Sequence, residues 1–144
     1  MTNHSLSWLP WALASAGFAA LTAIFGKVGV AAIAADLATL IRTVVILATL
    51  VVVVSATDQW QAPGSVPGKT WLFLVLSGLA TGASWLCYFR ALQLGDAARV
   101  APIDKLSVVL VAVFGVVLLG ERLSAMNWLG VGLIGAGATL VALK

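Results

Sequence analysis

Residues 123–143 read LSAMNWLGVGLIGAGATLVAL and carry no charged side chain. Two more runs without charge, 5–26 and 70–89, are of similar length. An α-helix rises about 1.5 Å per residue, so about 20 apolar residues cross the hydrocarbon core of a bilayer. Each of the three runs is therefore predicted to be a membrane-spanning helix.

Two shorter apolar runs, 43–57 and 106–120, become full spans once Arg42 is admitted to the first and Asp104 with Lys105 to the second. Both runs are rich in valine, but a lone strand in lipid leaves its backbone unsatisfied, so helices are predicted. The sequence thus predicts an all-α integral membrane fold, a bundle of five transmembrane helices in one domain over residues 1–144. We expect the helices at about 8–31, 37–57, 71–93, 97–119 and 124–143.

The composition excludes several classes of protein. Hydrophobic residues make up 62% of the chain and charged residues 9%, against about 45–50% and about 25% in soluble domains. The net charge is only +3 and forms no basic cluster, so no nucleic-acid partner is expected. The single histidine, His4, and the single cysteine, Cys87, form no catalytic or metal-binding pattern. Neither an enzyme nor a cofactor or metal site is expected.

Two signals for orientation in the bilayer oppose each other. Five spans put the termini on opposite sides, and on the N-terminal side tryptophans gather as an interfacial belt. These are Trp8, Trp11, Trp60, Trp71 and Trp128. Counting every Lys and Arg gives six on the opposite side against two, which favours a cytoplasmic location for that opposite side. Counting only loop and terminal residues gives two on each side, so both orientations stay open.

Five ionisable residues are predicted to lie in the same half of the bilayer: Lys27, Arg42, Arg90, Asp104 and Lys105. Such groups cost about 2.5–3.5 kcal/mol each at a helix centre and are candidates for function. One interpretation is that Lys27 and Arg90 extend to the headgroups from near their helix ends. Another pairs Asp104 with Arg42 or Lys27 in a structural salt bridge. A third makes the cations a pocket for a carboxylate or phosphate group, with Asp104 as counter-ion or proton site.

Pro102 precedes the Asp104–Lys105 pair by two residues. If the fourth helix begins near Asp96, the proline is interior and deprives the carbonyl of Ala98 of its usual partner. Freed backbone at membrane depth is tolerated where it lines a cavity, so a helix break at Pro102 is typical of a transport site. If the helix begins near Ala101, the proline lies in the first turn, where it costs little.

The third predicted helix has a polar face bordered by Trp85. The face consists of Ser77, Thr81, Ser84 and Tyr88, spaced by four, three and four residues. It predicts either an aqueous path with Trp85 and Tyr88 as its aromatic wall, or close packing of helices through small hydroxyl residues.

The fifth predicted helix is rich in glycine and has no charge. Gly132 and Ala136 form a small-x-x-x-small pair, and Gly130 and Gly137 repeat at seven residues. We therefore predict that Gly130, Gly132 and Gly137 contact a second copy in a dimer, although such glycines also serve packing within one chain.

Four segments of the second half form a recognisable set: YFRALQLG at 88–95, ARVAPIDK at 98–105, LLGERLS at 118–124 and LGVGLIGAG at 129–137. Together they resemble the EamA domain of the drug/metabolite transporter superfamily. The first half is similar in having Lys27 late in the first helix and Arg42 early in the second. The similarity covers nearly the whole chain, and its most specific part is the Leu-Gly-Glu-Arg turn.

The resemblance implies that this chain is a single five-helix repeat, whereas the majority of EamA proteins have two such repeats of inverted topology. It implies that two copies, arranged as an antiparallel homodimer, enclose a central cavity lined by helices 1 to 4. Superfamily members that export cations use a glutamate in the first helix, and this sequence has no acidic residue there.

One main hypothesis and two alternatives follow. The main hypothesis is a secondary transporter, an exporter of a small organic metabolite such as an amino acid or organic acid, working as a dimer by alternating access. It would lie in the lipid bilayer of a prokaryotic inner membrane. Its substrate-binding residues would be Lys27, Arg42, Trp85, Tyr88, Asp104 and Lys105. The alternatives are a proton-coupled exporter of cationic drugs and a non-transporting accessory subunit of a larger membrane complex.

Overall fold

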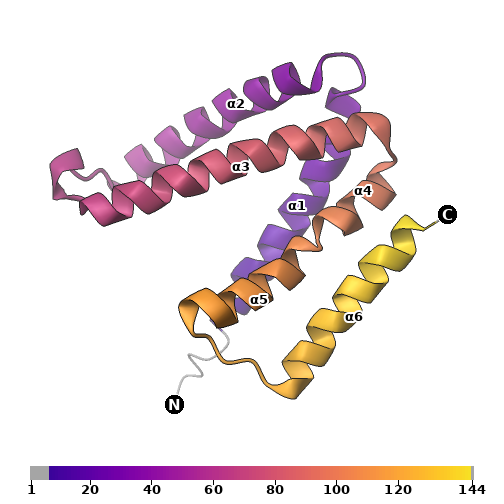
Figure 1. Ribbon diagram of the computed structural model, residues 1–144. Coiled ribbons are helices and arrows are strands. Elements are labelled where there is room, and N and C mark those ends of the chain that lie inside the picture. The colour runs from indigo at the N-terminus through magenta and orange to yellow at the C-terminus, as the bar shows by residue number, and fades with distance from the viewer. Residues whose placement is uncertain (1–6, 144) are drawn as a thin grey trace. The chain divides into compact units, whose positions relative to one another are not determined.

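A computed structural model describes residues 7–143, and all regular structure within them is helical (Figure 1). The helices are α1 (Leu9–Gly29), α2 (Ala35–Ala56), the short 3₁₀ helix η2 (Pro63–Ser65), α3 (Gly68–Leu94), α4 (Ala97–Asp104), α5 (Ser107–Leu119) and α6 (Ala125–Ala142). Five segments are long and apolar enough to cross a membrane: α1, α2, α3, α6 and the stretch Ala97–Leu119 that contains α4 and α5. The predicted all-α fold with five candidate spans is confirmed.

The chain divides into two compact units, and most contacts between residues lie within one unit or the other. The central unit, named only for its place in the middle of the sequence, is Gly26–Gln93. It contains the last turn of α1, all of α2 and nearly all of α3. The outer unit is likewise named for its place in the sequence. The outer unit consists of the residues up to Phe25 together with the chain from Leu94 onward, including α4, α5 and α6.

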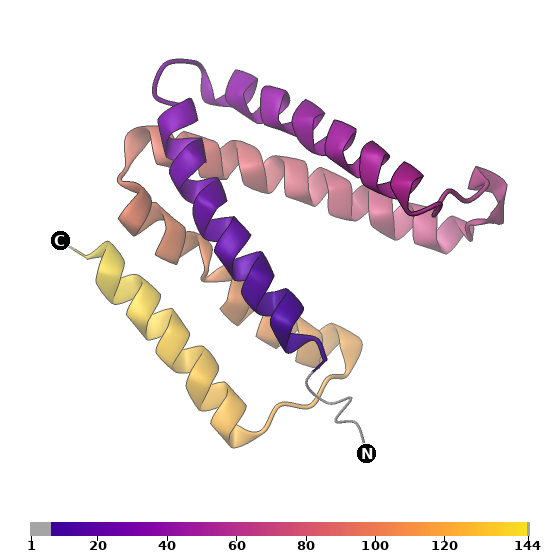
Figure 2. The same cartoon turned by 180° about the vertical axis from the view of Figure 1, so that it is seen from behind.

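In the central unit, α2 and α3 run side by side in opposite directions (Figures 1 and 2). The connection between them is fixed locally, because the Nε1 of Trp60 donates to Ser55 Oγ (3.1 Å) and that of Trp71 donates to the Pro63 carbonyl (3.3 Å). The α3 helix begins at Gly68, three residues before the predicted boundary. Its first turn forms on Pro67, whose carbonyl accepts from the Trp71 amide at 3.2 Å.

In the outer unit, α6 packs against both α4 and α5. The turn before α6 depends on two residues with specific backbone roles. Gly120 ends α5 in the left-handed region, with a φ of 71°, which a side chain would strain. Ser124 then caps α6, because its Oγ accepts from the amide of Asn127 at 3.2 Å.

The predicted fourth helix, 97–119, is divided in two. Pro102 lies inside α4, which begins at Ala97 and ends at Asp104. Beyond it the amides of Leu106 and Val108 donate to carbonyls only three residues earlier, those of Ile103 and Lys105, both at 3.0 Å. These tighter hydrogen bonds are typical of a 3₁₀ turn, and they separate α4 from α5 just where the charged pair lies.

Apolar side chains of the spans are largely exposed. In each candidate span, only 6–11% of the residues in the most apolar 18-residue stretch are buried within the chain. Large residues such as Phe18, Val117 and Leu140 are about two-thirds exposed or more. So much apolar surface is unfavourable in water, and a lipid bilayer or other protein must cover it.

Candidate functional site

The centre of the candidate site is the side chain of Arg42, on α2. Its guanidinium carbon lies 4.2 Å from the ring centroid of Trp85 and 4.7 Å from that of Phe89. Trp85 and Phe89 are four residues apart on α3 and therefore lie on one face of that helix. Both distances are within the range of a cation–π interaction, so two rings of α3 hold the cation of α2.

The nitrogen atoms of Arg42 have no acceptor within the central unit. No hydrogen bond or salt bridge of this guanidinium is found among residues 26–93, and the acidic residues of this unit, Asp36 and Asp58, form no salt bridge. No buried side-chain nitrogen or oxygen lacks a partner in this part of the chain, so the guanidinium nitrogens are accessible. An arginine has five N–H donors, and here they are available to an acceptor from outside the unit.

Tyr88, the other aromatic residue predicted for this site, is half-buried and lies on α3 between Trp85 and Phe89. Its ring meets that of Phe89 edge to face, with centroids 6.1 Å apart and planes at 75°. Tyr88 thus supports the ring next to which the guanidinium rests.

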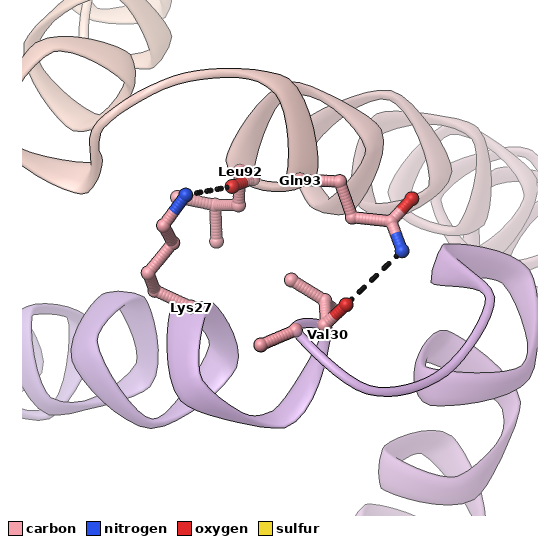
Figure 3. A pocket seen from close by; sticks show the side chains of 5 residues that line it. Lys27, Val30, Leu92 and Gln93 are labelled. Carbon is pink, nitrogen blue, oxygen red and sulfur yellow. Dashed lines mark hydrogen bonds between the residues drawn. The ribbon is translucent and has the colours of Figure 1, made fainter.

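Lys27 lies elsewhere in the central unit, in the last turn of α1. Its Nζ donates to the carbonyl of Leu92, in the last turn of α3, at 2.6 Å (Figure 3). In return Gln93 of α3 donates through Nε2 to the carbonyls of Val30 (3.1 Å) and Ile33 (2.8 Å), just beyond the end of α1. We call these three hydrogen bonds the helix-end clamp.

A pocket of about 370 Å³ lies at the helix-end clamp and is lined by Lys27, Val30, Ala31, Leu92 and Gln93. The carbonyls that approach it come from the C-terminal ends of two helices, where the helix dipole is negative. Cations are stabilised in such a place and anions are not. The ammonium of Lys27 is therefore suited to satisfy helix-end carbonyls rather than to bind an anion.

Asp104 and Lys105 belong to the outer unit and lie at the break between α4 and α5. They form a salt bridge with each other, with Lys105 Nζ at 3.2 Å from Asp104 Oδ2. Their side chains are 34% and 55% exposed, respectively, so the pair is accessible. Within the described part of its own unit, Asp104 thus forms a salt bridge with its chain neighbour.

The small residues predicted for helix contacts fall into two groups. A side chain at Gly130, Gly132 or Gly137 of α6 would meet nothing within 4 Å, and the same holds for Gly78 and Gly82 of α3. These surfaces are therefore open within the chain. At Gly135, in contrast, an added Cβ would lie 3.2 Å from Val109 Cγ2, so this glycine permits the packing of α6 on α5.

Phe89 and Gln93 are not among the site residues predicted from the sequence. Both follow Trp85 at intervals of four residues, and this spacing alone could have placed all three on one face of α3. Phe89 is an ordinary apolar residue within a span, and Gln93 lies near a helix end where polar residues are common. Only their contacts with α2 and with the end of α1 distinguish them.

Comparisons with known proteins agree with these observations. The model of the EamA-like transporter family matches residues 6–143. A protein from Sinorhizobium sp., named an uncharacterized transporter in the cobO 3′ region, is 70% identical over 138 residues, which cover 96% of this chain and 98% of the relative. No solved structure matches the chain. Among residues 7–143 no group of side chains has the composition of a metal site.

Proposed function

The chain belongs to the EamA-like transporter family, and on this premise we propose that it exports a small organic metabolite with a carboxylate group, such as an amino acid or organic acid. It does so as a secondary transporter, by alternating access, in a bacterial inner membrane. Membership of a transporter family makes an enzyme unlikely and favours an integral membrane protein with five spans.

The observation that carries the proposal is the state of Arg42. A guanidinium inside a membrane span is energetically costly, so its presence there indicates a function. This one rests on two aromatic rings and has accessible N–H donors. A planar guanidinium binds a carboxylate through two parallel N–H bonds, which a point charge such as lysine does not. Arg42 therefore acts as the anchor of the anionic group, and Trp85 and Phe89 keep the anchor in place.

Asp104 and Lys105 supply the second part of the mechanism. They lie at the interruption between α4 and α5, and broken helices are the segments that form substrate and ion sites in many transporters. Exchange of a proton at Asp104, or release of Lys105 from Asp104 to pair with the substrate carboxylate, would couple substrate binding to a change of state. Asp104→Asn removes the negative charge and is expected to stop transport while assembly persists.

The transporter works as an antiparallel homodimer. The match covers 98% of the Sinorhizobium relative, so that relative has about the length of one five-helix repeat. The open glycines of α6, Gly130, Gly132 and Gly137, offer a surface on which a second helix can approach closely. Reporters fused to the two termini, with maleimide labelling of the exposed Cys87, test this arrangement. Both orientations of each terminus support it, and a single orientation contradicts it.

The proposed function is tested by efflux from vesicles that contain the purified protein. The vesicles are loaded in turn with radiolabelled amino acids, with mono- and dicarboxylic acids, and with the cation ethidium. We expect efflux of a carboxylate by the natural protein and by Arg90→Ala, which removes an exposed arginine of α3. We expect none from Arg42→Ala.

Each other outcome contradicts the proposal in a different way. Equal efflux by Arg42→Ala and Arg90→Ala would exclude Arg42 as the anchor. Efflux of ethidium coupled to protons would favour an exporter of cationic drugs. No efflux of any compound, together with copurification of a different membrane protein, would favour an accessory subunit.

A further inference from the structure

We propose that Lys27 and Gln93 are positioning residues: through the helix-end clamp they set α2 against α3 and so hold Arg42 over Trp85 and Phe89. The effect on transport rests on the proposed function, but the geometry itself does not.

The clamp is reciprocal. The last carbonyls of a helix have no partner within it, and an unpaired backbone carbonyl is strongly unfavourable in a membrane. Here α1 donates to the end of α3 through Lys27, and α3 donates to the end of α1 through Gln93. Each helix thus satisfies a carbonyl of the other.

The clamp is also well packed, unlike most of the chain. Val30 is 2% exposed and Leu92 is fully buried. The carbonyls of these two residues accept the two partly buried hydrogen bonds of the clamp, which thus form around a small apolar core, whereas the bond from Gln93 to Ile33 is exposed. Such an arrangement has little freedom to shift.

One ring connects the clamp to the Arg42 site. Phe89 is 3% exposed, and an added Cβ at Gly26 would lie 3.2 Å from its ring. The ring under the guanidinium therefore also packs against the last turn of α1, one residue before Lys27. A movement of that turn therefore displaces the ring of Phe89.

A second connection runs through α2. Gln93 holds the carbonyl of Ile33, two residues before α2 begins at Ala35. Arg42 lies seven residues into this helix, about 10 Å along its axis at about 1.5 Å per residue. Because a helix moves as a stiff rod over this length, a change of the turn at Ile33 displaces Arg42 from the two rings.

The alternative role for Lys27, as a direct ligand of the substrate, is less compatible with its position. Its Nζ is 2.6 Å from a helix-end carbonyl, and the negative end of the α3 dipole would repel an anion. Lys27 and Gln93 therefore act on the substrate only through Arg42.

The test uses the fluorescence of Trp85 in the full chain in lipid vesicles, with the other five tryptophans replaced by phenylalanine. Emission maximum and quenching by acrylamide report whether a guanidinium covers the ring, and Arg42→Met supplies the reference for an uncovered ring. Gln93→Met removes the donor at nearly constant size, whereas Gln93→Lys keeps a donor of similar length. Arg90→Met is the control for loss of a cation elsewhere on α3.

We expect Gln93→Met and Lys27→Met to shift the Trp85 signals to those of Arg42→Met, and Gln93→Lys and Arg90→Met to leave them unchanged. Natural signals in both Gln93→Met and Lys27→Met would overturn the proposal. So would a Gln93→Lys variant that is helical by circular dichroism but resembles Gln93→Met. If Gln93→Met does not fold, the Trp85 fluorescence of Lys27→Met, which breaks the other half of the clamp, decides whether the proposal holds.

The fluorescence result does not depend on a substrate. If the natural protein moves no carboxylate, the proposed function fails and the geometric role of the clamp is still decided. If a carboxylate is moved, its KM should rise in Gln93→Met and return in Gln93→Lys.

Discussion

The C-terminal half of α3 and the helix α6 are both apolar spans, but they contact the rest of the chain in opposite ways. Between Trp85 and Gln93, α3 uses aromatic faces, a side-chain amide and a backbone carbonyl to contact charged and polar groups. Within its span α6 offers glycines and small residues, and its contacts are those of close packing. Directional polar contacts select one geometry and one ligand, whereas close packing fixes distances between helices. We therefore expect changes near α3 to alter transport and changes in α6 to alter stability or assembly.

Among the substitutions that compare these two helices, Arg42→Lys should have the largest effect. It keeps the positive charge of α2 next to the two rings of α3 but removes the planar fork and its stacking on those rings. A hydrogen bond to a charged group contributes about 1.5–3 kcal/mol, so carboxylate efflux should fall about 10- to 150-fold. Efflux from vesicles measures this loss, with the amount of reconstituted protein held equal. Natural rates in Arg42→Lys would mean that charge alone matters and that the rings have no role in recognition.

The next effect concerns the packed side of α6. Gly135→Leu forces a side chain against Val109 and should destabilise the fold by about 1–3 kcal/mol, the usual cost of overpacking. The measurement is the midpoint of thermal unfolding in detergent. Gly132→Leu is the matched control, because its side chain would enter open space. If the two variants unfold at the same temperature, α6 does not pack on α5 through Gly135.

The open side of α6 should affect association instead. Interhelical side-chain hydrogen bonds contribute about 1–2 kcal/mol in model peptides, and a loss of close packing on the same scale in Gly132→Leu should weaken the homodimer about 5- to 30-fold. Energy transfer between labelled copies, diluted with lipid, gives the dissociation constant. An unchanged constant in Gly132→Leu, and likewise in Gly130→Leu and Gly137→Leu, would place the contact between copies on another helix.

The smallest effect is expected at the start of α6. Ser124→Ala removes the oxygen that accepts from the Asn127 amide and should cost about 1 kcal/mol. The unfolding midpoint should fall slightly, and Ser124→Asp, another good cap, should restore it. A stability equal to that of the natural protein in Ser124→Ala would show that water or headgroups cap the helix equally well.

The amino-acid sequence was sufficient for the number of spans and for several of their ends. Length and hydropathy are properties of each segment, and a bilayer demands both of every helix that crosses it, so no knowledge of neighbours is needed. Gly120 and Ser124 mark the turn before α6 for similarly local reasons. The division at Lys105–Leu106 was only half visible, because Pro102 signals a disturbed helix but not the residue at which it stops.

The partner of each polar side chain was decided by the tertiary structure alone. Lys27 and Arg42 look alike in the sequence, as cations late in one span and early in the next. Yet Lys27 reaches a carbonyl 65 residues away, and Arg42 rests on rings more than 40 residues away. Such pairs depend on which helix faces come together, and neither the hydrophobic periodicity nor the composition of a helix specifies which face meets which neighbour. The sequence therefore determined that this is a five-span membrane protein of a transporter type. The folded chain decided which cation is committed to a helix end and which has donors accessible to a substrate.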